Sequence, residues 1–400
     1  MDNPFTSFSL WAGLFGGLAL FLFGMDVMTH ALKSAAGDYI KDILARMTRN
    51  RFVGVGMGAF VTAIIQSSSV TTVIMVGFIS AGLMTMSQSV AVIIGANIGT
   101  TITAQILAFK VTKLALPLIA AGFLVSFTAK SEHWRQGGSI VLGLGLIFFG
   151  MAIMSDALYP LRSYPPFIDF MVSMNSVLLA AAMGAAFTAI VQSSSATTGI
   201  LIVLASQGLI ALETAIAIAM GANIGTCVTA LLASIGKPRE AKRAALVHTI
   251  FNVSGVLIWI AFIPQLAAFA QWVSPSAEGL AGMDRLAAET PRQIANVHTF
   301  FNVANALIFI GFTTQIARLV ERLLPDRPEP PAKAMLPKYL DEDMLDTPAV
   351  ALEAARSEIK RLGKRVRKMV RDVMPVAITG TRTDLERIVE MDKVVDALHI

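Results

Sequence analysis

Long apolar segments separated by short polar ones dominate this chain. Segments such as Leu10–Phe23, Ile140–Ile153 and Ala244–Ile263 contain no Asp, Glu, Lys or Arg. Uncharged apolar helices of this kind are typical of membrane spans rather than of a soluble core. We expect the remaining spans near residues 88–108, 114–129, 138–157, 213–234 and 294–316. The pattern therefore predicts an all-α integral membrane protein.

A polar phrase interrupts this apolar pattern twice, 126 positions apart. Thr62–Thr72 reads TAIIQSSSVTT, and Thr188–Thr198 reads TAIVQSSSATT. Two more pairs of segments keep the same order and the same offset: Leu20–Leu32 with Leu146–Leu158, and Gly95–Thr101 (GANIGTT) with Gly221–Cys227 (GANIGTC). Three matches at one offset predict an internal duplication from about residue 10 to 236.

The basic residues predict that the two copies have opposite orientations. The segment Lys33–Arg51 carries five Lys and Arg residues, whereas its counterpart Tyr159–Val177 carries only Arg162. Since cytoplasmic loops are enriched in positive charge, we expect the first segment inside and the second outside. Opposed copies follow the inverted-repeat plan of many secondary transporters. The alternative, a parallel repeat, would require Lys33–Arg51 to lie outside.

The segments around the two polar phrases are too short to be ordinary spans. A helix over the fourteen residues of Phe52–Ile65 covers roughly 21 Å, against about 30 Å of hydrocarbon. We therefore expect Phe52–Gly82 and Leu178–Gly208 to be re-entrant hairpins that break near the middle of the membrane. Broken backbone at that depth is tolerated only against protein or a wet cavity.

The two QSSS sequences are the strongest candidates for a binding site. Helix N-termini at a hairpin tip present N–H groups that bind anions. The carbonyls freed by the break, together with Ser and Thr hydroxyls, are hard oxygen ligands that suit Na⁺. The alternative is packing between helices, which accounts for one or two hydroxyls but not for the same six polar residues twice. Because the phrases carry no charge, an oxyanion held there depends on neutral donors, helix dipoles and bound cations.

Two other motifs place polar side chains within apolar helices. We expect the GANIGT segments to unwind locally and to lend side chains and carbonyls to cation sites. The alternative is close helix packing through small residues. VHTIFNV (Val247–Val253) and VHTFFNV (Val297–Val303) repeat at an offset of 50. Two histidines without a carboxylate are weak evidence for a metal, so we expect His248 and His298 to be packing residues, with support of the hairpins as the functional alternative.

The composition excludes several classes of protein. Cys227 is the only cysteine, which rules out an internal disulfide or a four-thiolate metal site. The net charge of +5 arises from short loops and the tail, so nucleic acid is not an expected partner. The chain has no nucleotide-binding or hydrolase motif, and the Ser clusters have no His or Lys base at helical spacing. We therefore expect that the protein is not an enzyme and has no resident cofactor. For a transporter without a nucleotide site, coupling to an ion gradient is the energy source that remains.

The chain changes character from Arg318 onward. Prolines from Pro325 to Pro337 predict a stiff linker. Asp346–Val373 predicts a charged amphipathic helix, and a second helix begins near Thr383, so we expect a soluble helical domain that is cut short at Ile400. The expected division is repeat 1 at 1–130, repeat 2 at 131–245, additional membrane helices at 246–317, the linker at 318–345 and a partial helical domain at 346–400.

These motifs resemble the type II sodium/phosphate cotransporter family, whose hallmark is two inverted repeats with a QSSS hairpin and a GANIGT-like segment each. The resemblance covers about residues 10–316. It implies symport of inorganic phosphate with Na⁺ as coupling ion, by alternating access. Three alternatives stay open: transport of another oxyanion, phosphate efflux, and a membrane phosphate sensor without net transport.

The resemblance also implies where the protein works. Residues 346–400 resemble the start of the PhoU-like domain that bacterial members carry, and the loop Lys130–Gly137 lacks the large extracellular insertion of animal members. A multi-pass protein of a bacterial inner membrane follows, with the N-terminus external and the tail cytoplasmic. Its expected partners are phosphate, Na⁺, the lipid bilayer and a second copy in a dimer.

The ligand residues are implied by the family pattern as well. Phosphate would be bound by Gln66, Ser67, Ser68, Gln192, Ser193 and Ser194. Sodium would be bound by Ser69, Thr71, Thr72, Asn97, Thr100, Ser195, Thr197, Thr198, Asn223 and Thr226. Cys227 stands where the first copy has Thr101, so we do not expect the two cation sites to be fully symmetric.

Overall fold

The described part of the chain consists of α-helices and short 3-10 helices, without a β-strand. The computed structural model describes residues 4–45, 50–80, 84–109, 112–173, 176–325, 337, 339–340 and 348–399. Among these residues, six segments are long and apolar enough to cross a membrane: Phe8–Ala35, Met86–Leu107, Glu132–Ser163, Leu212–Ala233, Arg239–Val273 and Gly282–Leu323. The predicted all-α membrane protein is thereby confirmed.

The helices around the two polar phrases have the same boundaries in both copies. The first copy contains α2 (Arg51–Ile65), α3 (Ser68–Ser80) and α4 (Met86–Leu107), and the second contains α8 (Val177–Val191), α9 (Ser194–Ser206) and α10 (Leu212–Ala233). Each boundary in the second copy lies 126 positions after its counterpart. The duplicated sequence therefore produces the same local structure twice.

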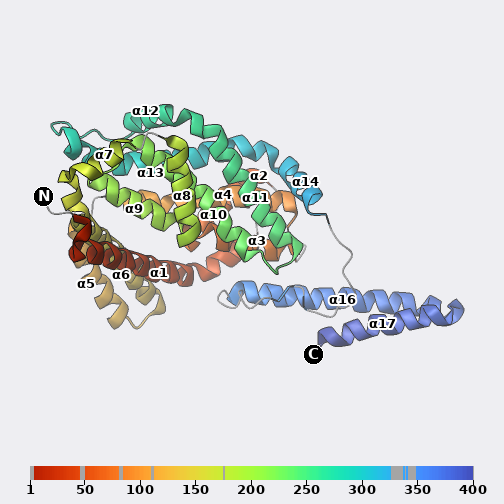
Figure 1. Cartoon of the computed structure of the whole chain (residues 1–400). Helices are drawn as coiled ribbons and strands as arrows, with labels where there is room; N and C mark the ends of the chain where they lie inside the picture. Colours follow the sequence, from red (N-terminus) through yellow and green to blue (C-terminus); the bar gives the residue numbers. More distant parts are fainter. Residues whose placement is uncertain are drawn as a thin grey trace.

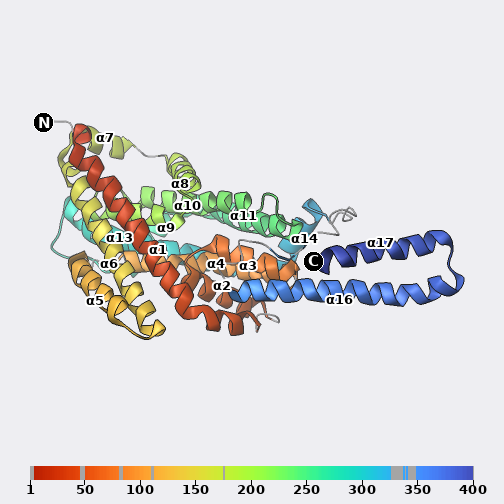
Figure 2. The same ribbon diagram turned by 90° about the horizontal axis from the view of Figure 1, so that it is seen from below.

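Two helices that match at this offset, α1 (Phe8–Ala45) and α6 (Glu132–Leu158), pack against each other in antiparallel directions (Figures 1 and 2). A Cβ atom added to Gly24 would lie 2.7 Å from the carbonyl oxygen of Gly143, and one added to Gly150 would lie 2.5 Å from that of Gly17. Higher numbers on α1 thus face lower numbers on α6. The antiparallel contact agrees with opposed copies, although their orientation in a membrane stays a prediction.

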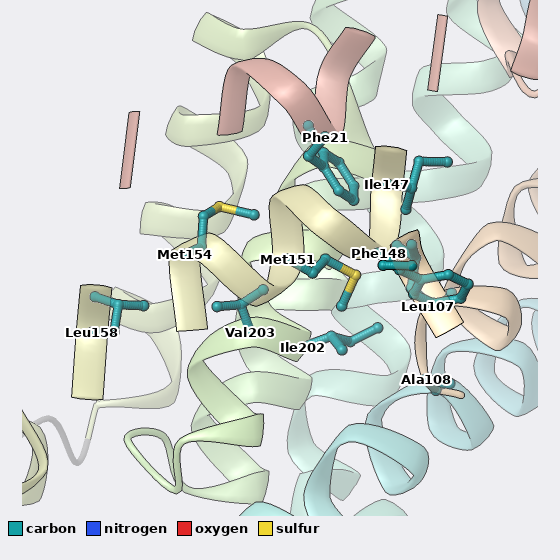
Figure 3. Close-up of a cluster of buried hydrophobic side chains, with 14 of the residues drawn as sticks. Phe21, Leu107, Ala108, Ile147, Phe148, Met151, Met154, Leu158, Ile202 and Val203 are labelled. Atoms are coloured by element: carbon teal, nitrogen blue, oxygen red, sulfur yellow. The ribbon is translucent and has the colours of Figure 1, made fainter. Parts of the chain in front are cut away.

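A hydrophobic cluster joins this helix pair to the other elements (Figure 3). Phe21 of α1 is fully buried beside Ile147 and Phe148 of α6. The tip of its ring meets Gly199 of α9, where an added Cβ would be 2.4 Å from the Phe21 Cζ atom. Leu107 of α4 belongs to the same cluster. Burying a side chain of this size contributes about 1.5–3 kcal/mol, so the cluster fixes α1 and α6 against α4 and α9.

A second internal match, at an offset of 50, covers the helices after α10. One unit is α11 (Arg239–Trp259), η4 (Ile260–Phe262) and α12 (Ile263–Val273), and the other is α13 (Gly282–Phe309), η5 (Ile310–Phe312) and α14 (Thr313–Leu323). The final helix of each unit begins at position 263 or 313, after a short 3-10 break. The VHT motifs lie in α11 and α13.

The remaining helices connect or extend these units. They are η1 (Pro4–Thr6), η2 (Thr112–Leu114), α5 (Ala115–Thr128), η3 (Tyr159–Ser163), α7 (Pro165–Ser173), α16 (Pro348–Thr379) and α17 (Arg382–His399). The last two form an antiparallel pair that extends away from the apolar helices (Figure 2). The Thr381 Oγ1 atom caps α17 by accepting from the Asp384 N–H at 3.3 Å. The hydroxyl and N–H of Thr381 in turn donate to the Asp384 carboxylate, which lowers the pKa of that carboxyl below its usual value.

The helix boundaries correct three predictions. Lys33–Ala45 is not a loop but the end of α1, since this stretch contains no proline to stop the helix. Arg318 does not begin the linker but lies within α14, where Ile316 and Val320 are buried. The predicted crossing near 114–129 is the 14-residue helix α5, about 21 Å long and shorter than a full span. Gly82 and most of the Pro-rich linker lie outside the described residues.

We predict that Gly95→Ala lowers the apparent melting temperature of the detergent-solubilised protein. A Cβ atom at this position would lie 2.0 Å from the carbonyl oxygen of Val55 on α2. Since backbone cannot move away as a side chain can, we expect an overpacking cost of about 1–3 kcal/mol.

Gly56→Ala is the matched control, because an added Cβ at that helical position has no neighbour within 4 Å. Replacing an unencumbered helical glycine stabilises by about 0.5–1 kcal/mol. Equal melting temperatures for the two variants would contradict close α2–α4 packing.

Candidate functional site

Both polar phrases lie at breaks between two helices. Gln66 ends α2 with φ 58° and ψ 22°, and Gln192 ends α8 with φ 58° and ψ 23°. They are the only residues other than glycine with positive φ among those described. The left-handed conformation is unfavourable for a side chain of this kind and persists only where the surroundings impose it. The two copies therefore end this helix in the same way, at matching positions.

A buried pair of hydroxyl groups closes each break. The Thr62 and Thr71 Oγ1 atoms lie 2.8 Å apart, and the Thr188 and Thr197 Oγ1 atoms lie 2.7 Å apart. All four side chains are buried. The two threonines of a pair come from the two sides of the break, so each pair links the helix before the break to the helix after it. A polar pair of this kind offsets the cost of burying each hydroxyl alone.

The first serine after each glutamine caps the next helix. The Ser67 Oγ atom accepts from the N–H of Val70 at 3.3 Å, and the Ser193 Oγ atom accepts from the N–H of Ala196 at 3.1 Å. The caps satisfy one of the N–H groups that a helix start leaves unpaired. Ser68 and Ser194 are the first residues of α3 and α9, and N–H groups at a helix start have no partner within their own helix.

Several hydroxyls predicted to bind sodium donate their hydrogen to a carbonyl of their own helix. Thr72 donates to the Ser68 carbonyl and Thr198 to the Ser194 carbonyl, both at 2.8 Å. Thr71 and Thr197 donate to the Ser67 and Ser193 carbonyls in the same manner. A hydroxyl that donates in this way still has oxygen lone pairs for a cation. Ser195 is buried beside them, and Ser69 is half-buried.

The GANIGT segments do not unwind as we predicted. They lie in the uninterrupted helices α4 and α10. The Thr100 hydroxyl donates to the Asn97 carbonyl at 2.7 Å, and the Thr226 hydroxyl donates to the Ala222 carbonyl at 2.8 Å. The glycines instead allow close approach, since an added Cβ at Gly221 would lie 1.9 Å from the Ala181 carbonyl oxygen. These glycines therefore serve close packing between helices. Because the helices are not broken here, the carbonyls of the GANIGT segments are not made available as cation ligands.

The two copies cross at the centre of the molecule. Helix α3 of the first copy contacts α10 of the second, and α9 contacts α4 (Figure 1). Each QSSS-bearing helix thus packs on the GANIGT helix of the other copy. Since α2 and α8 in turn pack on α4 and α10, the two sets of predicted site residues belong to one connected group of six helices.

Each VHT histidine lies against one GANIGT asparagine. The distance from His248 Nε2 to Asn97 Oδ1 is 3.4 Å, and that from His298 Nε2 to Asn223 Oδ1 is also 3.4 Å. All four side chains are buried. The first pair links α11 to the first copy and the second links α13 to the second copy. Within the described residues no group of three His, Cys, Asp or Glu side chains could hold a metal ion.

Sequence reasoning missed these pairings, although it found both repeats. The sequence shows the offset of 50 between the histidines and the offset of 126 between the asparagines, but it does not show which histidine meets which asparagine. Sequence reasoning also missed Thr103, whose hydroxyl donates to the Gln66 side-chain oxygen. Cys227 occupies the position that matches Thr101 of the first copy. Its buried thiol lies 3.5 Å from the Asn223 carbonyl oxygen of α10 and 3.8 Å from the His248 carbonyl oxygen of α11, so it packs between these two helices.

The family described as Na+/Pi-cotransporter matches residues 20–156 and 170–283 of this chain. The match includes both polar phrases, both GANIGT segments and α11. No solved structure matches the chain.

Individual relatives extend this similarity. "Uncharacterized protein YqeW" of Bacillus subtilis (strain 168) is 34% identical over 64% of this chain and 84% of its own length. "Putative inorganic phosphate export protein YjbB" of Escherichia coli (strain K12) is 27% identical over 93% of this chain and 66% of its own length. "Sodium-dependent phosphate transport protein 2A" of Rattus norvegicus is 25% identical over 62% of this chain and 60% of its own length.

We predict that Thr71→Val destabilises the protein by about 1–3 kcal/mol, because the buried Thr62 hydroxyl loses its partner. Thermal unfolding in detergent measures the effect. The double variant Thr62→Val/Thr71→Val is expected to unfold at a higher temperature than Thr71→Val alone, since it leaves no hydroxyl unpaired.

Thr128→Val is the control, because its hydroxyl donates to the Leu124 carbonyl at an exposed helix end. It is expected to change stability by less than about 0.5 kcal/mol. A double variant less stable than Thr71→Val would show that the hydroxyl pair does not close the break.

Proposed function

The chain belongs to the Na+/Pi-cotransporter family, and from this premise we propose that it carries inorganic phosphate across a membrane with Na⁺ as the coupling ion. The observation that supports this proposal most directly is the pair of matched breaks at Gln66 and Gln192. Broken backbone at membrane depth is tolerated only where protein or a wet cavity surrounds it, and secondary transporters form their substrate and ion sites at such broken helices.

Phosphate binding would rest on neutral donors at the two breaks. The proposed ligands are Gln66, Ser67 and Ser68 with their counterparts Gln192, Ser193 and Ser194. Each helix start contributes N–H groups and the positive end of a helix dipole, equivalent to about half an elementary charge. Two such ends offset about one negative charge of a phosphate, so a doubly charged phosphate requires further positive charge.

Sodium would supply that charge, which gives a physical reason for coupling. Neither the QSSS phrases nor the GANIGT segments contain Lys or Arg. The proposed cation ligands are Ser69, Thr71, Thr72, Ser195, Thr197 and Thr198, whose hydroxyl oxygens lie beside the breaks. Because α4 and α10 are unbroken, Asn97, Thr100, Asn223 and Thr226 would contribute side-chain oxygens only. Bound Na⁺ would raise the affinity for phosphate, and by linkage phosphate would raise the affinity for Na⁺.

The two copies would provide alternating access. In an inverted repeat, movement of one copy against the other exposes a central site to each side in turn. We propose a multi-pass protein of a cell inner membrane, with the N-terminus external and the tail cytoplasmic. Symport into the cell is the first candidate direction. Net phosphate efflux is the second, and it is favoured by the name of the YjbB relative.

We predict that purified protein in proteoliposomes accumulates radiolabelled phosphate when an inward Na⁺ gradient is imposed, but not with an equal K⁺ gradient. Loading phosphate inside and reversing the gradient measures efflux in the same preparation. Deletion of residues 346–400 is expected to leave flux intact. Phosphate movement that is indifferent to Na⁺ would contradict coupling, and no movement in either direction would favour the sensor alternative.

We predict that Ser68→Ala and Ser194→Ala each raise the phosphate concentration for half-maximal uptake by about 10- to 100-fold, since a hydrogen bond to a charged group contributes about 1.5–3 kcal/mol. Initial rates over a range of phosphate concentrations measure the change. The control is Ser126→Ala on α5, whose hydroxyl donates only to the nearby Phe123 carbonyl. An unchanged half-maximal phosphate concentration in both variants would contradict the assignment of phosphate binding to the two breaks.

A further inference from the structure

The two glutamines at the breaks have the same backbone but different side-chain surroundings. Their φ and ψ angles agree within 1°. The Gln66 side chain is half-buried and held at both ends, because its oxygen accepts from the Thr103 hydroxyl and its nitrogen donates to the Ala63 carbonyl. The Gln192 side chain is exposed. Since the backbone angles agree, the difference between the two residues lies in the partners and the exposure of their side chains.

The residue that matches Thr103 in the second copy is Thr229. Its hydroxyl oxygen is buried and has no hydrogen-bond partner within the described part of the chain. A buried hydroxyl without a partner is unfavourable and calls for an explanation. In the first copy the same position is satisfied by Gln66. The unpaired Thr229 hydroxyl therefore marks the place that the Gln192 side chain would occupy if it retracted.

We propose that Thr103 and Thr229 are positioning residues that hold the side chains of Gln66 and Gln192 in turn, so that each glutamine amide is presented to the substrate only when its threonine releases it. This inference rests on the proposed function. The structure has the first glutamine held and the second released. Exchange of these two arrangements requires no backbone change at the breaks and is a two-state element that substrate binding can bias.

The neighbouring hydroxyl on α4 does not share this property. Thr101 donates to the Ile98 carbonyl of its own helix, and its counterpart in the second copy is Cys227, which has no hydroxyl. Thr103 and Thr229 are both threonine, and each is set one turn beyond a GANIGT segment. Thr101 thus provides a matched control within two residues of Thr103.

The first experiment is a pair of double-mutant cycles read by thermal unfolding in detergent without phosphate. We expect Thr103→Val and Gln66→Ala to be coupled, with the double variant departing from additivity by about 2–4 °C. Thr229→Val and Gln192→Ala are expected to be additive, because the structure has that glutamine released. Thr101→Val combined with Gln66→Ala is expected to be additive. Additivity of Thr103→Val with Gln66→Ala would overturn the proposal.

The second experiment reads the same cycles by Na⁺-driven phosphate flux. Here we expect coupling in both copies, with each double variant departing from the product of its single effects by about threefold or more. Thr103→Ser and Thr229→Ser keep a hydroxyl and are expected to restore flux. Coupling of Thr103 with Gln66 but not of Thr229 with Gln192 would contradict the proposed exchange between the two copies. Wild-type flux separates the two claims: its absence rejects the proposed function, and the unfolding cycles then still decide whether Thr103 holds Gln66.

Discussion

Backbone that leaves the helix inside an apolar layer must find partners for its polar groups, and this constraint shapes the whole centre of the molecule. Each break has an intramolecular solution. A threonine pair bridges it, a serine caps the following helix, and the glutamine N–H bonds back to the preceding turn at 2.7 Å. The break can exist only where other helices exclude lipid, which is why α4 and α10 pack so closely on α2 and α8.

Glycine makes that close packing possible. Gly58 and Gly95 on the facing helices of the first copy leave no room for a Cβ atom, and Gly184 and Gly221 repeat the arrangement in the second. Backbone-to-backbone contact fixes the position of α2 along α4. Because the break follows the last residue of α2, this contact also fixes where the break lies relative to α4. The glycines of the GANIGT segments therefore act on the site through position rather than by unwinding a helix.

The site that results is polar but uncharged, and this accounts for the kind of transport we propose. An arginine or lysine in the centre would bind phosphate without help and would be costly to desolvate when the site is empty. Hydroxyls, amides and helix starts are less costly to leave empty, but they bind an anion weakly unless a cation accompanies it. The buried His248–Asn97 and His298–Asn223 pairs fix α11 to α4 and α13 to α10.

The sequence by itself determined the class of protein, the duplication, the location of both breaks and the family, because apolar length and repeated motifs are local and can be read along the chain. The predicted unwinding of the GANIGT segments was wrong. Glycines in a membrane helix are compatible with unwinding and with close packing, and only the position of the facing helix distinguishes these two roles. The sequence could not pair His248 with Asn97, because nothing along the chain says which of two repeats meets which. The contrast between Gln66 and Gln192 depended on tertiary structure most of all. Identical phrases have identical local preferences, so only the different surroundings of the two side chains could make one held and the other exposed.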